Sequence, residues 1–249
     1  MSKNKVTTYL LYAIGEIVLV VIGILIAVSI NNWNNDRKDR KAEEVLLIQL
    51  QSEFESNLAQ LEEKMQIRSN AIRGVLRLLD YVDHPEKRNA DSTLLFLGQT
   101  ITAPTFDPIV NDLISAGRLQ LLTNDTLKTM LSQWTSEIIQ VKEEEDAWKQ
   151  IRETRYFPYL IKETSFRILL NSYFETGQFD LHLIDKNASL RVAIAKDQSI
   201  ESIMDILDHP DFEDHIADCA AFHSVANVQS EIMRDRIISI LDIIKSQLK

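Results

Sequence analysis

The chain has 249 residues, with 27 Lys or Arg against 37 Asp or Glu, and a formal net charge of −10 at pH 7. Once Lys3, Lys5 and Glu16 are subtracted, residues 31–249 carry a net charge of −11, so this part of the chain should repel nucleic acid. The single cysteine, Cys219, excludes an internal disulfide. Six glycines and five prolines allow few loops, which favours a helix bundle over a turn-rich β fold.

The segment Tyr9–Ile30, YLLYAIGEIVLVVIGILIAVSI, is apolar and carries one charged residue, Glu16. With a rise of ~1.5 Å per residue, about 20 apolar residues cross a hydrocarbon core of ~30 Å. The sequence therefore predicts a transmembrane helix over 9–30 that contacts the lipid bilayer. A short tail (1–8) precedes it, and a juxtamembrane segment (31–45) and an acidic α-helical bundle domain (46–249) follow.

A cleaved signal peptide is the alternative interpretation of this N-terminus, because Ala27-Val28-Ser29 resembles a cleavage site. The apolar region of a signal peptide usually has about 7–15 residues, and this one is longer. Tyr9, Tyr12 and Trp33 also lie where interfacial aromatic residues occur. An uncleaved membrane anchor fits these features better.

One face of the predicted membrane helix contains mostly small residues together with the carboxylate of Glu16. Its members follow 3-4-3-4 spacing: Ala13, Glu16, Val20, Gly23 and Ala27. Small residues allow two helices to approach closely, and a carboxylate in a membrane usually faces protein or water. We expect this face to contact a second copy of the chain or another membrane protein. A proton or ion pathway through Glu16 is the alternative.

Apolar residues at helical spacing predict further helices along the chain. They cover 42–82, 92–100, 108–117, 124–155, 198–207 and 211–249. Asn57 and Arg68 interrupt the apolar face of the first of these helices. The acidic residues of that helix, including Glu43, and the charged run 142–146 are interpreted as solvated. The first and last helices have similar lengths, which suggests that they pack against each other. The prediction is an all-α fold, a transmembrane helix followed by a long-helix antiparallel bundle.

Residues 178–195 are the exception to the helical pattern. Alternating apolar residues on both sides of Asp185-Lys186-Asn187 fit a small β-hairpin, and a helix or a loop is the alternative. Ahead of this segment, an aromatic cluster surrounds Pro158, which should kink or end the helix that contains it. We interpret the cluster as core at a bend; a surface for a small ligand or a partner is the alternative.

Two segments resemble a known family. The first is YLLYAIGEIVLVVIGILIAVSINNWN at 9–34, and the second is TFDPIVNDLISAGRLQLL at 105–122. They are similar to signatures of a family of uncharacterised bacterial single-pass membrane proteins, a domain of unknown function. The resemblance implies one N-terminal anchor in the bacterial inner membrane and a helical C-terminal domain, with no known reaction, ligand or cofactor.

The side of the membrane on which the domain lies stays open. Members of that family often have a longer basic tail that favours a domain outside the cytoplasm, whereas the tail of this chain is short. The bases Arg37, Lys38, Arg40 and Lys41 after the membrane helix outnumber Lys3 and Lys5 before it. This count leans toward a cytoplasmic domain.

A helix-borne cluster near the C-terminus is the one candidate for metal chemistry. His215, Cys219 and His223 stand at i, i+4 and i+8, a spacing at which neighbours can share a metal ion. The outer two would lie ~12 Å apart along the axis, so one ion cannot bind all three. We expect core residues here and no cofactor.

No catalytic motif, such as GxSxG, HExxH or a phosphate-binding glycine-rich loop, occurs in the sequence. The sequence therefore favours a membrane-anchored interaction, scaffold or sensor protein that self-associates and is not an enzyme. The alternative is a subunit of an ion- or proton-conducting assembly in which Glu16 titrates. A metalloenzyme based on the histidine cluster is a third, weaker hypothesis.

Overall fold

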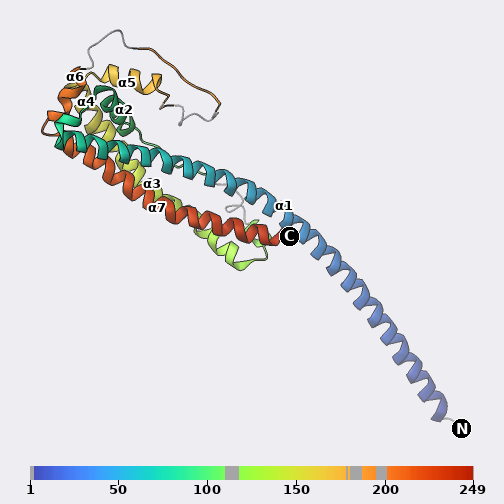
Figure 1. The fold of residues 1–249 in the computed structure, drawn as a ribbon. Helices are drawn as coiled ribbons and strands as arrows, with labels where there is room; N and C mark the ends of the chain where they lie inside the picture. Colours follow the sequence, from blue (N-terminus) through green and yellow to red (C-terminus); the bar gives the residue numbers. More distant parts are fainter. Residues whose placement is uncertain (1–2, 110–117, 178, 180–186, 195–200, 249) are drawn as a thin grey trace.

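The structure, a computed structural model, describes residues 3–109, 118–177, 179, 187–194 and 201–248. Its largest element is the helix α1, which runs without interruption from Lys3 to Asp83 over 81 residues. The N-terminal half of α1 projects away from the rest of the chain, and its C-terminal half joins a bundle (Figure 1). The predicted membrane segment and the first helix of the bundle are thus one continuous helix.

Three long helices form the body of the bundle: α1, α3 (Asp125–Ile151) and α7 (Phe212–Gln247). Arg234 of α7 pairs with Glu62 of α1 at 2.8 Å, and Lys245 pairs with Glu55 at 3.3 Å, so the two helices run antiparallel. An ion pair of 2.7 Å between Arg236 and Glu137 joins α7 to α3. The predicted all-α fold and the pairing of its first and last helices are confirmed.

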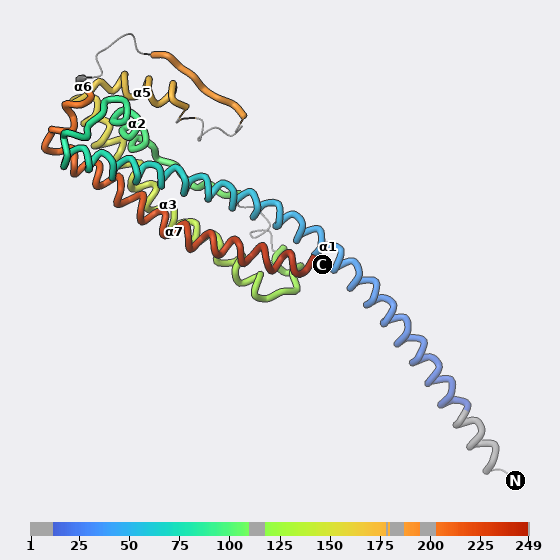
Figure 2. The backbone as a smooth tube through the Cα atoms, in the orientation of Figure 1, coloured from blue at the N-terminus to red at the C-terminus, as the bar shows by residue number. Residues whose placement is uncertain are grey.

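Short helices gather at the end of the bundle farthest from the N-terminus (Figures 1 and 2). They are α2 (Ala90–Thr100), α4 (Phe157–Glu163), α5 (Phe166–Glu175) and α6 (Glu201–Met204). Single turns of 3₁₀-helix occur at Pro85–Lys87, Arg118–Leu121 and Asp205–Asp208, and a π-helical turn occurs at Arg152–Tyr156.

Local sequence explains several of the helix ends. Asn124 caps α3, since its side chain accepts the N–H of Leu127 at 2.9 Å; Asn124 and Thr123 were the two cap candidates in the sequence. Asn89 caps α2 in the same way by accepting the N–H of Ser92, a cap that the sequence analysis does not predict. The π-turn lies directly before Pro158, which has no N–H to donate and whose ring crowds the carbonyl four residues earlier. The predicted kink is therefore a widened turn between α3 and α4.

The buried side chains form two separate cores along the bundle. The proximal core, nearer the projecting part of α1, contains residues such as Leu50, Phe54, Trp134 and Ile240. The distal core contains Val75, Trp148, Tyr156 and Phe212, among others, and is closed by the short helices. Tyr156 and Tyr173 are buried in the distal core, which agrees with the interpretation of the aromatic cluster as core at a bend.

The predicted β-hairpin at 178–195 is not present in the described part of that segment, which comprises 179 and 187–194. The remaining residues of the segment lie outside the described ones. The backbone of Ile194 bonds to side chains of α5 instead of a partner strand: its N–H donates to Asn171 Oδ1 at 2.7 Å, and its carbonyl accepts from Arg167. An isolated two-stranded hairpin is marginal in water, and these side chains satisfy the backbone of Ile194 without one.

Other predicted boundaries differ from the structure or fall outside it. The predicted helix over 198–207 is the short α6 followed by the 3₁₀ turn Asp205–Asp208, and 198–200 lie outside the described residues. The predicted helix over 108–117 begins in non-helical backbone at 108–109, and 110–117 are likewise outside the described residues.

Candidate functional site

The projecting part of α1 exposes an unusual amount of apolar surface. All side chains from residue 12 to residue 41 are exposed, including Ile17, Leu19 and Leu25. Within the described part of the chain, α1 is the one helix that is long and apolar enough to cross a membrane, judged by length and composition. Nothing in the described bundle covers this segment.

The five residues of the predicted contact face, Ala13, Glu16, Val20, Gly23 and Ala27, all lie on this exposed part of α1. A β-carbon built on Gly23 would meet no atom within 4 Å. At about 100° per residue, this face points more than about 90° away from the side on which Leu50 joins the bundle. The bundle of the same chain therefore does not block a second helix from this face.

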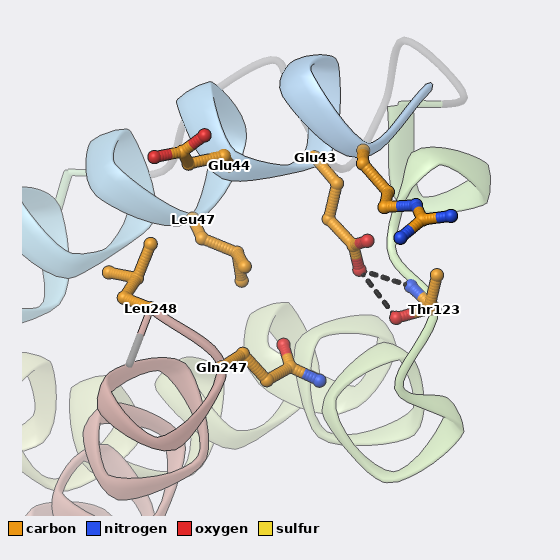
Figure 3. A pocket seen from close by; sticks show the side chains of 7 residues that line it. Glu43, Glu44, Leu47, Thr123, Gln247 and Leu248 are labelled. Atoms are coloured by element: carbon orange, nitrogen blue, oxygen red, sulfur yellow. Dashed lines mark hydrogen bonds between the residues drawn. The ribbon is translucent and has the colours of Figure 1, made fainter. Parts of the chain in front are cut away.

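A pocket of about 350 Å³ lies at the base of the bundle, where α1 leaves it (Figure 3). Its lining comes from α1, from the turn before α3 and from the C-terminal end of α7: Arg40, Glu43, Glu44, Leu47, Thr123, Gln247 and Leu248. The carboxylate of Glu43 accepts hydrogen bonds from the N–H and the hydroxyl of Thr123, the latter at 2.7 Å.

The prediction that Glu43 is solvated is wrong, because its side chain is buried. Its carboxylate ties the start of α3 to α1, so this end of the pocket has a structural role.

A buried polar layer separates the proximal core from the distal core. It consists of Arg68 on α1, Glu145 on α3, and Asn227 and Ser230 on α7. The guanidinium of Arg68 donates to the Glu145 carboxylate, to Ser230 Oγ at 2.6 Å and to Asn227 Oδ1 at 2.7 Å. The second oxygen of Glu145 accepts the backbone N–H of Phe106 at 2.7 Å. The Arg68–Glu145 ion pair and the hydrogen bonds of its two side chains thus join all three long helices and the connection between α2 and α3.

The electrostatics of this layer are those of a charge pair removed from water. Desolvation by burial raises the pKa of Glu145, and the neighbouring Arg68 and the Phe106 N–H oppose that rise. Desolvation likewise lowers the pKa of Arg68, and Glu145 opposes it. The prediction of a solvated Glu145 within the charged run 142–146 is wrong. The one signal that could have indicated the layer was Arg68 itself, a charged residue on an otherwise apolar helix face.

Asn57, the other polar interruption on that face, has a similar role. Its amide oxygen accepts the N–H of Ile109 at 2.8 Å, and its amide nitrogen donates to the Ile109 carbonyl at 3.1 Å. This pair of bonds holds the connection between α2 and α3 against α1.

The three residues of the metal hypothesis lie on one side of α7 but have different protein partners. The ring of His215 stacks 4.2 Å from that of Tyr159. The Cys219 thiol is buried 3.6 Å from the Thr100 carbonyl, and burial raises its pKa. His223 packs edge-on against Trp148, and burial lowers its pKa to about 3. No group of three or more His, Cys, Asp or Glu suited to a metal ion occurs among the described residues.

Comparisons with known proteins add one finding. No curated protein and no solved structure matches the chain. Residues 16–88 match a family of unknown function, DUF6090. The match begins at Glu16, covers the rest of α1 and ends shortly after it, whereas the second resembling segment at 105–122 lies outside it. The part of the chain that is similar to this family is therefore the continuous helix that carries both the exposed apolar segment and one wall of the bundle.

Proposed function

We propose that this protein is a single-pass membrane protein of the bacterial inner membrane, whose acidic helical domain acts as an interaction, scaffold or sensor module and self-associates through its anchor. The observation that carries the proposal is the continuity of α1. Its N-terminal half contains an apolar segment that no other part of the described bundle covers, and its C-terminal half supplies buried side chains to both cores. No catalytic role is included.

The apolar surface supports the membrane anchor. Soluble monomers rarely expose a contiguous apolar patch larger than a few hundred Å². Here a run of aliphatic side chains from Ile14 to Ile30 is about half exposed or more all around the helix. Transfer of that surface into hydrocarbon removes its unfavourable hydration, at roughly 25 cal/mol for each Å².

The continuity of α1 supports a sensor or scaffold role. The same helix supplies Leu50 and Phe54 to the proximal core and Val75 and Leu78 to the distal core. It has no break where it leaves the bundle toward the membrane segment. A shift or rotation of α1 in the membrane would therefore be transmitted to the packing of both cores, and a partner bound to the bundle would act on the membrane helix in return.

Self-association is proposed through the face that contains Gly23 and Ala27. These two form a small-xxx-small pair, which allows close approach of a second helix. The same contact would shield the Glu16 carboxyl from lipid. A different membrane protein with a matching face is the other candidate partner.

Membrane fractionation tests the anchor. The full chain should stay with membranes through high-salt and alkaline washes, and a chain that begins at residue 31 should be released. A full-length chain that remains in solution without detergent would contradict the proposal.

Energy transfer between labelled copies in a bilayer tests self-association. Gly23→Ile should weaken the transfer, and Val21→Ile, on another face of the same helix, should not. Because a β-carbon on Gly23 meets no atom of its own chain, a loss of transfer reports contact with a partner. Equal transfer in both variants would refute the proposed face.

A further inference from the structure

We infer that the first turns of α1 beyond the apolar segment bind anionic phospholipid headgroups through one basic side of the helix. This inference rests on the proposed membrane anchor and adds the class of lipid that the anchor selects. The side chains concerned are Arg37, Lys38 and Lys41, with Arg40 at the edge, and all four are exposed.

The charges around α1 are separated by side at this level. At about 100° per residue, Asp36 and Asp39 point to the side on which Leu50 enters the bundle, whereas Arg37, Lys38 and Lys41 point away from it. The exposed indole of Trp33 lies on the flank next to Arg37. The sum of the charges between residues 36 and 41 is only +2, but within this range one side of the helix presents bases without acids, and the next acid on that side is the exposed Glu44.

The position of these bases matches the headgroup layer. Arg37 and Lys38 follow Ile30 by ~10–12 Å along the axis, and Lys41 by ~16 Å. The polar layer on each side of a bilayer is roughly 5–8 Å thick, and long basic side chains can extend back toward it. Arg37 and Lys38 therefore reach the phosphates, and Lys41 lies within about one Debye length of them.

The basic side of α1 contrasts with the acidic bundle that follows it. Residues 31–249 carry a net charge of −11, which an anionic membrane surface would repel. The first buried bundle residue, Glu43, follows Ile30 by ~20 Å along α1, so the helix holds the bundle away from the surface while its bases touch it. Anionic lipid next to the anchor would thus be attracted by this basic side of α1, which lies at its level.

The three tryptophans of the chain provide the test. Trp134 and Trp148 are buried in the bundle, each 1% exposed, whereas Trp33 is 61% exposed at the expected interface. The full chain is reconstituted into vesicles that mix phosphatidylcholine and phosphatidylglycerol, and one of the two lipids carries acyl chains brominated near the headgroup. Bromine quenches tryptophan fluorescence on contact, so quenching reports which lipid surrounds Trp33.

We expect brominated phosphatidylglycerol to quench Trp33 about twofold or more better than brominated phosphatidylcholine at the same mole fraction, and the preference to fall in high salt. The variant R37Q/K38Q/K41Q should lose the preference. The matched control R73Q/R77Q/K149Q removes the same number of positive charges from exposed positions at the distal end and should keep it.

The outcomes separate the inference from the proposed function. Equal quenching by both lipids, or a preference that survives in R37Q/K38Q/K41Q, would overturn the lipid inference and leave the anchor intact. Absence of quenching by either lipid would mean that Trp33 is not at a membrane, and the proposed anchor itself would fail.

Discussion

The buried polar layer provides the sharpest test of how the bundle is held together. Arg68→Met removes the guanidinium and leaves the Glu145 carboxylate with one remaining hydrogen bond, from the Phe106 N–H. It also removes the N–H groups that donate hydrogen bonds to Ser230 Oγ and Asn227 Oδ1. The side chains of Arg68 and Glu145 are 0% and 1% exposed, so water cannot replace the lost partner.

The expected cost is about 3–5 kcal/mol, because removal of one partner of a buried ion pair leaves an uncompensated charge. For a domain of this size, that cost lowers Tm by about 6–20 °C. Glu145→Leu should cost a similar amount. The double variant R68M/E145L removes both charges, and the loss of the acceptor for Phe106 then leaves a cost of only about 1–3 kcal/mol. The two single effects should therefore be strongly non-additive.

Thermal or denaturant unfolding of the full chain in detergent micelles, followed by tryptophan fluorescence, measures these effects. The matched control is Arg234→Met, which breaks the exposed pair with Glu62 between α1 and α7 and should leave stability nearly unchanged. A cost below about 1 kcal/mol for Arg68→Met, or strictly additive single effects, would refute the role assigned to the layer.

Three further predictions follow from single residues. Gly74→Ala should destabilise the bundle by about 1–3 kcal/mol, because the added β-carbon would lie 3.0 Å from a backbone carbonyl oxygen of α2; Gly23→Ala on the same helix is the neutral control in unfolding experiments. Burial lowers the pKa of His223 from 6.5 to about 3, so the side chain stays neutral in the folded protein at pH values where it is charged in the unfolded chain. Its contribution to the free energy of unfolding is therefore complete above pH 6.5 and is lost as pH falls below that value. Wild type should therefore lose about 2 kcal/mol more than His223→Phe between pH 7 and pH 5; parallel curves for the two proteins would contradict this. Glu16→Gln separates the proposed contact from the conducting alternative: a contact role changes association measured by energy transfer and leaves no ion flux to lose, whereas loss of flux through an intact assembly would favour conduction.

Much of the fold could be predicted from periodicity alone. The apolar stripes that contain Leu50 and Phe54 on α1 and Ile237 and Ile240 on α7 are long enough to identify both helices, and their similar length indicated that they pair. The cap at Asn124 also depends on local sequence alone, because the side chain of Asn124 accepts the N–H of a residue three positions later. Predictions failed where local sequence competes with distant contacts. The alternating pattern at 178–195 suggested strands, but in the described part of that segment Asn171 and Arg167 of α5 satisfy the backbone of Ile194.

The placement of Glu16 and Gly23 on one face of the exposed apolar segment was predictable for the same reason that helices are: it follows from helical spacing, whatever the rest of the chain does. The polar layer was not. Arg68 and Glu145 are 77 residues apart, and nothing near either residue in the sequence distinguishes a buried carboxylate from its solvated neighbours in the run 142–146.

The sequence by itself thus determined the long apolar segment that could cross a membrane, the helical class and the acidity of the body, since each depends on composition or on spacing within one helix. Only the tertiary structure decided that the apolar segment and the bundle share one unbroken helix, that the core is divided in two, and which charges lie at the division. The reason is physical: burial of a charge is a property of three helices packed together, and it is set by partners that no single segment contains.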